Sequence, residues 1–245
     1  MTTPDSKVEN PPGRNDRFAT THWSVVVSAG DSRSPQAERS LAVLCENYWF
    51  PLYAFIRRAG HSAEDAQDLT QGFFVRLLDK RFLAAADRQK GRFRTFLLTA
   101  VKHFLANEHD RATAKKRGGG RTVVPLEDLE ARYAREPADT LTPERIFERQ
   151  WALTLLEQVL VRLQREMAAQ GKAALFDALK DSLAGGPADG YAATADRLGM
   201  TEGAVKTAAH RLRRRYRELL REEIAKTVAG PDEVEEEIRY LFDCL

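Results

Sequence analysis

The sequence has only two cysteines, Cys45 and Cys244, and they lie at opposite ends of a chain of 245 residues. Neither has the spacing to a histidine or to the other cysteine that a zinc site requires, so we expect a reducing compartment and no bound metal. Long apolar runs are also missing, which argues against a membrane span. The first twenty residues are polar and rich in proline, aspartate and asparagine, unlike a signal peptide. We therefore expect a cytoplasmic protein that does not contact a membrane.

Strand-like alternation of polar and apolar residues is absent over any useful length, whereas helical periodicity begins near Gln36 and continues to His109. The fold class that we predict is therefore all-α. A convincing nucleophile, a set of metal ligands and a phosphate-binding loop are lacking as well, so we expect no enzymatic activity. The enzymatic alternative is a metal-dependent nuclease that uses the acidic residues around Asp65.

The net charge of +2 hides a strong segregation of charge along the chain. Basic residues gather at 88–121 and 206–221, and acidic residues gather at 127–148 and 232–243. For a polyanionic partner, such local fields matter more than their sum. The hydrophobic content of 43% and the charged content of 30% are ordinary for a globular protein and argue against disorder throughout.

Residues 191–220 have the pattern of a helix-turn-helix with a basic second helix. The first helix stops at Gly199, which accepts the positive φ of a tight turn, and Thr201 stands where the second helix needs an N-cap. The buried side of the second helix is an apolar stripe of Val205, Ala209, Leu212, Tyr216 and Leu219. Its opposite side carries Lys206, Thr207, His210, Arg211, Arg214 and Arg217. Such a helix suits the major groove of duplex DNA, and a merely solvated basic face is the alternative.

A second candidate site is the acidic start of a helix predicted over 63–78, where Ser62 and Asp65 have the spacing of a capping box. Glu64, Asp65 and Asp68 complement the helix dipole there, so capping and solvation already account for them. A metal site and an acidic patch that binds another protein are the functional alternatives. The residues alone leave this choice open.

A third candidate site lies on a helix predicted over 92–111, whose aromatic face we assign to the core. The other face is polar and basic, and its side chains are of the kinds that hold phosphates and read exposed bases. These side chains are Arg94, Thr95, Thr99, Lys102, His103, Asn107 and Arg111. A solvated surface is the competing interpretation on periodicity alone.

We divide the chain where helical periodicity stops. The segment after the glycine run at 118–120 is acidic and contains proline, which is typical of a flexible linker between two helical domains. The predicted division is an N-terminal extension at 1–35, a first domain at 36–117, the linker at 118–143, a second domain with the helix-turn-helix at 144–228, and an acidic C-terminal helix at 229–245.

Three motifs in this order resemble the extracytoplasmic-function group of bacterial RNA polymerase sigma factors. They are AEDAQDLTQGFFVRLL, GRFRTFLLTAVKHFLANEHDRATAKKR and, after the linker, YAATADRLGMTEGAVKTAAHRLRRRYREL. The resemblance covers roughly 36–117 and 145–226, and residues 20–26 resemble an extension found in some members. It implies a transcription initiation factor that needs no cofactor. Its first domain would bind core polymerase and the −10 promoter element, and its second domain would read the −35 element.

The resemblance also implies roles for individual residues by their position in the motifs. The segment that would dock on the coiled coil of the polymerase β′ subunit contains Glu64, Asp65, Asp68, Leu69, Gln71 and Phe74. Contacts to the −10 element would come from Arg94, Thr99, Lys102, His103, Asn107 and Arg111. Here Lys102 and His103 stand where the family usually has Arg-Asn, and Asn107 stands where Asp is common. Contacts to the −35 element would come from Gly203, Lys206, Thr207, His210, Arg211 and Arg214.

The implied partners are core RNA polymerase, through its β′ and β subunits, and promoter DNA. An anti-sigma factor or a kinase would supply the activating signal. The main alternative is a helix-turn-helix regulator that binds operator DNA without polymerase, usually as a dimer on paired half-sites. The basic stretch 206–217 disfavours a scaffold that binds no DNA. We expect the acidic tail to pack on the second domain; the competing hypothesis is that it weakens promoter binding until polymerase displaces it.

Overall fold

The computed structural model describes Val26, Ala29 and residues 37–77, 92–112, 125–136, 141–183, 190–228 and 230–245. In these residues all regular structure is helical, which confirms the predicted fold class. The α-helices are α2 (Ala37–Arg58), α3 (Ala63–Leu77), α5 (Phe93–Ala112), α6 (Leu126–Tyr133), α7 (Pro143–Ala169), α8 (Ala173–Leu179), α9 (Gly190–Leu198), α10 (Glu202–Ala225) and α11 (Val234–Asp243). The 3₁₀ turn η2 (Lys180–Leu183) follows α8, and the 3₁₀ turn η3 (Pro231–Glu233) precedes α11. The predicted N-terminal extension lies outside the described residues except for Val26 and Ala29, which are buried.

Helix starts and stops follow the local chemistry of the sequence. The Ser62 hydroxyl accepts a hydrogen bond from the backbone N–H of Asp65 (3.1 Å) and caps α3. The Thr201 hydroxyl accepts one from the N–H of Ala204 (3.2 Å) and caps α10. Gly199, between α9 and α10, has a φ of 63°, a left-handed conformation that suits glycine. These contacts confirm both predicted caps and the predicted turn.

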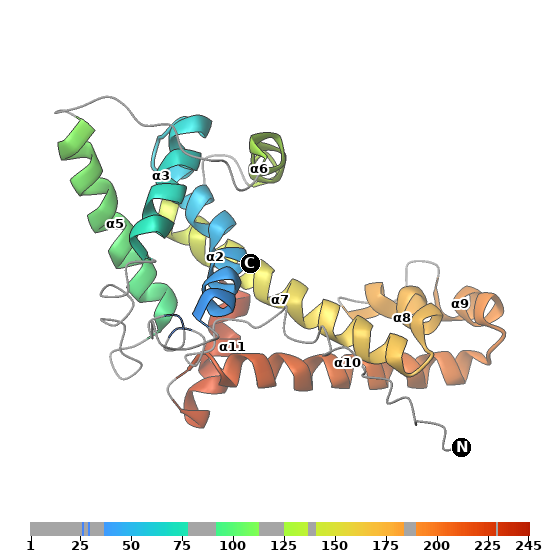
Figure 1. Cartoon of the computed structure of the whole chain (residues 1–245). Coiled ribbons are helices and arrows are strands. Elements are labelled where there is room, and N and C mark those ends of the chain that lie inside the picture. Colours follow the sequence, from blue (N-terminus) through green and yellow to red (C-terminus); the bar gives the residue numbers. More distant parts are fainter. Residues whose placement is uncertain are drawn as a thin grey trace, which may run out of the picture.

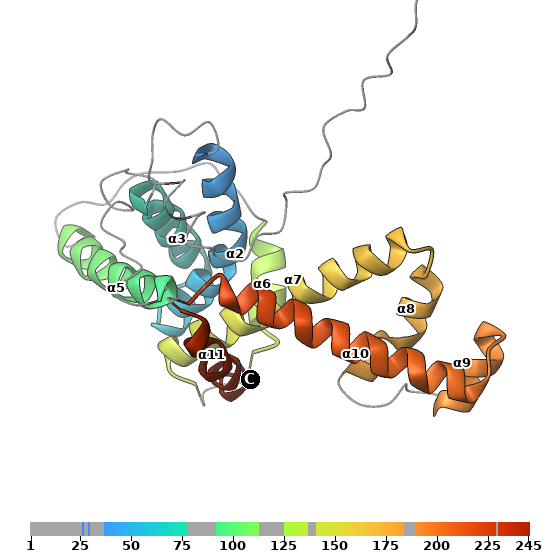
Figure 2. The ribbon, with the colours of Figure 1, turned by 90° about the horizontal axis from the view of Figure 1, so that it is seen from below.

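The helices form two groups that α7 connects (Figure 1). At one end, α2, α3 and α5 pack together, and at the other end α8 and α9 lie beside the far ends of α7 and α10. α10 returns along α7, and α11 lies where α5, α7 and α10 come together (Figure 2). No helix in the described ranges has the length and apolar character needed to cross a bilayer.

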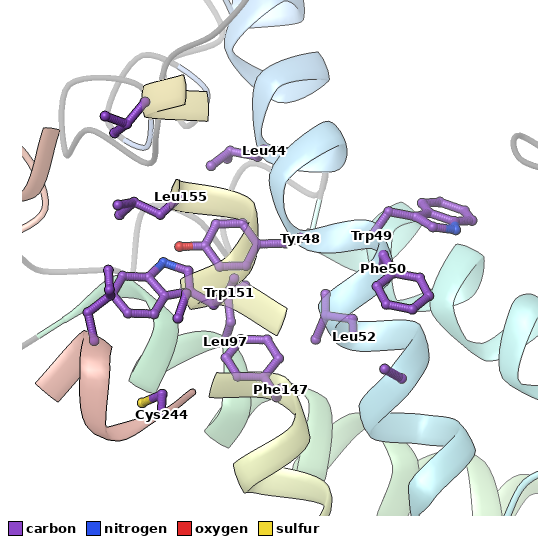
Figure 3. Close-up of a cluster of buried hydrophobic side chains, with 14 of the residues drawn as sticks. Leu44, Tyr48, Trp49, Phe50, Leu52, Leu97, Phe147, Trp151, Leu155 and Cys244 are labelled. Atoms are coloured by element: carbon purple, nitrogen blue, oxygen red, sulfur yellow. The ribbon is translucent and has the colours of Figure 1, made fainter. Parts of the chain in front are cut away.

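The contact between α2 and α7 is built from aromatic rings. Tyr48 points from α2 toward α7, where its ring stacks on Phe147 with the centroids 6.3 Å apart, and it meets Phe93 of α5 edge-on at 5.7 Å (Figure 3). Trp49 points to the other side of α2 and stacks on Phe74 of α3 at 5.2 Å. Adjacent residues of α2 therefore anchor different neighbours, because successive side chains of a helix point about 100° apart.

Part of the predicted linker is helical and is held on α2. Glu130 of α6 accepts hydrogen bonds from Arg57 Nε (2.8 Å) and Nη2 (3.0 Å), and the Tyr53 hydroxyl donates to the same carboxylate. The Arg57 hydrogen bonds hold the pKa of Glu130 below its ordinary value, whereas burial raises the pKa of Tyr53. Residues 118–124 and 137–140 of the predicted linker lie outside the described part of the chain.

Charged side chains fasten the second half of α7 to α10. Arg162 donates to Glu222 (2.6 Å) and to Glu223 (2.7 Å), and Arg215 donates to both carboxylate oxygens of Glu166 (2.8 and 3.0 Å). α7 therefore contacts both α2 and α10. A single helix thus touches elements of both predicted domains.

Candidate functional site

The predicted basic helix is α10, and its two faces separate as the sequence predicts. Val205, Ala209, Leu212 and Leu219 are buried, and the half-buried Tyr216 donates a hydrogen bond from its hydroxyl to the backbone oxygen of Leu156 (3.3 Å). Burial raises the pKa of Tyr216 to about 12. The residues that the resemblance assigns to the −35 element are all exposed: Gly203, Lys206, Thr207, His210, Arg211 and Arg214.

Two cations on this exposed face pair with acidic residues at the surface. Lys206 pairs with Glu202 one turn away (2.7 Å), which raises the pKa of the lysine and keeps it charged. Arg214 pairs with Glu218 (3.0 Å), and its side chain is 76% exposed. Exposed pairs of this kind are weak, so both cations can exchange a carboxylate for a phosphate with little loss.

The run Arg213-Arg214-Arg215 looks uniform in the sequence, but its members have different roles in the fold. Arg213 donates from Nε to the backbone oxygen of Ser182 (2.7 Å) and from Nη2 to the Tyr191 hydroxyl (2.7 Å), which ties α10 to η2 and α9. Arg215 is held on α7 by its paired carboxylate. Arg214 alone among the three points into solvent, so it is the member of this run that is available to a polyanion.

The cap of α10 gives a first testable prediction. Replacing Thr201 with alanine removes the hydroxyl that caps α10, and we expect the free energy of unfolding to fall by about 1 kcal/mol. Thr201→Ser keeps the hydroxyl and is the matched control, for which we expect little change. Urea denaturation followed by circular dichroism measures both. Equal loss in the two variants would mean that the threonine methyl group, not the cap, is what matters.

The acidic start of α3 is exposed, as the sequence predicts. Glu64, Asp65 and Asp68 all face solvent. Val75 lies seven residues after Asp68 on the same side of the helix, and it is 65% exposed. The sequence analysis missed Val75, although its spacing of seven residues, about two helical turns, already aligned it with Asp68. This side of α3, which we call the α3 stripe (Glu64, Asp65, Asp68 and Val75), combines negative charge with an exposed apolar side chain.

The other three residues assigned to polymerase docking lie elsewhere on α3. Leu69 and Gln71 are half-buried at the edges of the packed face. Phe74 is only 3% exposed, because its ring is stacked on Trp49. Phe74 therefore supports the helix from inside, and the structure brings together only the three acidic members of the predicted set.

The polar face of α5 contains a cavity of about 420 Å³. Thr99, His103 and Asn107 follow one another at intervals of four residues along it, and Arg76 reaches it from α3. All three predicted residues are exposed. A cavity with hydroxyl, imidazole, amide and guanidinium groups on its wall offers both donors and acceptors to an unstacked base.

Two further predicted residues of α5 are placed differently from this group. Lys102 is exposed and pairs with Glu144 at the start of α7 (2.7 Å), which holds the pKa of that carboxyl below its ordinary value. Arg111 belongs to α5, but its side chain lies outside the described part of the structure. No cluster of three or more histidine, cysteine, aspartate or glutamate side chains suited to a metal occurs among the described residues.

Arg94 is the member of the predicted nucleic-acid surface whose position differs most from expectation. It is 5% exposed, and its guanidinium lies between the rings of Trp151 (4.2 Å) and Tyr240 (4.8 Å). The signal was present in the sequence: Arg94 precedes Leu97 and Val101 by three and seven residues, so it belongs to the apolar side of α5. The prediction placed Arg94 on the polar face because an arginine side chain is usually exposed.

Comparisons of this chain with models of known protein families, with curated proteins and with solved structures found no match. The functional interpretation therefore rests on the sequence motifs and on the geometry described above.

Proposed function

We propose that this protein is a sigma factor of the extracytoplasmic-function type, which binds core RNA polymerase and directs it to promoters. The observation that carries this proposal is the exposed face of α10. It presents lysine, arginine, histidine and threonine side chains from a helix that is capped, packed along its other side and preceded by α9 and a glycine turn. We interpret α9 and α10 as a helix-turn-helix that places α10 in the major groove of the −35 element.

The α3 stripe supports the docking of core polymerase. Three exposed carboxylates lie beside an exposed valine, and in the described part of the structure the helix dipole is the feature that accounts for their grouping. A basic and partly apolar surface on another protein would complement them, and the charges would steer the encounter. In the proposed function that surface belongs to the β′ subunit.

The cavity on α5 supports contact with the −10 element. Opening a duplex exposes bases, and the cost of unstacking each base is a few kcal/mol. Groups such as Thr99, His103 and Asn107 offset that cost when they hydrogen-bond to a captured base. Lys102 precedes His103 in the sequence, and its exposed pair with Glu144 would have to be exchanged for a backbone phosphate when DNA binds.

The proposed mechanism is binding by two linked surfaces. Each surface alone binds DNA weakly, because each contributes only a few phosphate contacts. When polymerase holds both surfaces at the spacing of the two promoter elements, the second contact becomes intramolecular and the combined affinity rises. Specificity then depends on both elements being present at that spacing.

Co-purification with core polymerase tests this proposal directly. We expect stoichiometric binding by the wild-type chain and a loss of affinity of about a hundredfold for Asp65→Lys/Asp68→Lys, because reversed charges meet the same partner surface. The control is Asp177→Lys/Asp181→Lys, which makes the same change of charge at two exposed acidic residues of α8 and η2. Equal binding by all three proteins would exclude the α3 stripe as the docking surface.

The outcome also separates sigma factors from regulators that bind operators alone. A wild-type chain that does not bind polymerase but keeps its affinity for duplex DNA is a regulator of the second kind. In that class the α3 stripe has no role, and a dimer on paired half-sites is expected.

A further inference from the structure

The C-terminal helix α11 is fastened to both of the helices that are proposed to contact DNA. Its first turn contains Glu235, Glu236 and Glu237. Glu235 pairs with Arg221 of α10 (2.8 Å), and Glu237 pairs with two arginines at the start of α5. α11 thus connects α5 to α10 through ion pairs. Figure 2 shows α11 beside the ends of these two helices.

The pair at the start of α5 is the buried one. Glu237 is fully buried, and its two carboxylate oxygens accept from Nη1 and Nη2 of Arg94, the latter at 3.2 Å. Arg92, immediately before α5, lies 2.9 Å away from the same carboxylate through its Nε. One carboxylate therefore holds two guanidinium groups, which is the arrangement that arginines also adopt around a phosphate.

Two arginines share one fully buried glutamate at this position. Among the described residues, Glu236 lies 4.0 Å from Arg92 and is 69% exposed, and Glu148 of α7 hydrogen-bonds to Tyr240, whose ring lies 4.8 Å from the Arg94 guanidinium. A buried ion pair contributes little net stability, but a buried charge that has lost its partner is costly. Glu237 can therefore leave cheaply only when another anion takes its place.

The attachment of α11 is suited to release as a unit. The helix has 10 residues, which is too short to be stable alone, and it follows Gly230 and the turn η3. Leu241 and Cys244 are buried, but Phe242 and Leu245 remain 53% and 47% exposed. Its apolar side is thus only partly covered, as expected for an element that detaches locally.

We infer that α11 is an internal competitor of nucleic acid: its Glu237 occupies the place of a backbone phosphate on Arg92 and Arg94, and α11 must detach before these arginines bind DNA. This inference deepens the proposed function and rests on it, because it assigns α5 to the promoter. It also accounts for Arg94, which motif position assigns to DNA although the closed structure buries it. A polyanion that binds α5 replaces the negative charge of Glu237 on Arg92 and Arg94, and α11 then detaches.

Cys244 provides a natural probe of this event, because burial protects its thiol and raises its pKa. We would measure the rate at which N-ethylmaleimide modifies Cys244 in the wild-type chain, read from the mass of the C-terminal peptide. A single-stranded 20-mer of random sequence is the ligand. At saturating oligonucleotide we expect the rate to rise about tenfold, since release exposes the thiol. An unchanged rate with oligonucleotide bound would overturn the inference.

Two variants test the role of the carboxylate. Glu237→Gln removes the buried charge, and we expect fast modification of Cys244 without DNA together with about tenfold tighter binding of the oligonucleotide. Asp232→Asn removes the same charge from an exposed position in the same segment and is expected to behave like wild type. Fast modification of Cys244 without a gain in affinity for the oligonucleotide would mean that α11 only stabilises the fold and does not compete with DNA.

The two proposals fail in different ways. If the chain binds core polymerase and DNA but the thiol of Cys244 stays protected throughout, the competitor role is wrong and the sigma factor assignment stands. If the chain does not bind polymerase, the sigma factor assignment is wrong whatever the thiol does. Should Glu237→Gln fail to fold, the modification rates of the wild-type chain still decide the question.

Discussion

Replacing Phe73 with alanine is expected to lower the free energy of unfolding by about 3–5 kcal/mol, the usual range for a fully buried phenylalanine. The Phe73 side chain is completely buried in the contact between α2, α3 and α5. Its ring meets Phe104 of α5 edge-on at 5.7 Å and Phe74 at 6.2 Å, so alanine would remove both aromatic contacts and leave a cavity. Urea denaturation followed by tryptophan fluorescence measures the change.

The next residue but one offers a matched control for that experiment. Val75 belongs to the same helix but is 65% exposed, so Val75→Ala should change stability by no more than about 0.5 kcal/mol. If Phe73→Ala were as mild as Val75→Ala, the core would have to relax around the missing ring. That result would contradict the tight packing described between α3 and α5.

The second large effect concerns the exposed cations of α10. We expect Arg211→Glu/Arg214→Glu to weaken binding to a duplex of 30 base pairs by about 100-fold at low salt, because two attractions to phosphates become repulsions. In a plot of log affinity against log salt concentration, the slope should decrease in magnitude by about 1.8, since each of the two lost phosphate contacts contributes about 0.9. Fluorescence anisotropy over a salt series measures both quantities.

The control for this double variant makes the same change of charge at two positions outside α10. Arg135→Glu/Lys180→Glu alters two exposed cations on the turn after α6 and on η2, and we expect less than about a threefold effect from their longer-range field. Equal losses in the two double variants would show that net charge alone governs binding. The exposed face of α10 would then have no special part in it.

Most helix boundaries were predictable because they depend on neighbouring residues. The helix predicted over 63–78 corresponds to α3 (Ala63–Leu77), and the helix predicted over 92–111 corresponds to α5 (Phe93–Ala112). The hydroxyls of Ser62 and Thr201 each accept a hydrogen bond from the backbone N–H three residues later in the sequence. The signal for each helix start is therefore local. Periodicity then fixed which side of each helix is apolar.

The candidate site was predicted less completely, because its remaining features depend on residues distant in the sequence. The spacing of Arg94 to Leu97 and Val101 indicated its burial, but its ion-pair partner Glu237 is 143 residues away, and no local pattern identifies that partner. Arg213 and Arg215 differ from the exposed Arg214 because η2, α9 and α7 provide hydrogen-bond partners for them. The type of a residue indicated its charge correctly, whereas its availability to a ligand required the tertiary structure.

The continuity of α7 has a consequence for how this chain tolerates changes in length. The helix has 27 residues, about 40 Å at 1.5 Å per residue, and it contacts α2 near Phe147 and α10 near Arg162. One residue inserted between these positions would turn the second contact by about 100° relative to the first. Seven inserted residues, close to two full turns, would instead nearly preserve the angular phase and increase the distance between the contacts by about 10 Å. The number of residues in α7 therefore sets the rotational alignment between α2 and the exposed face of α10.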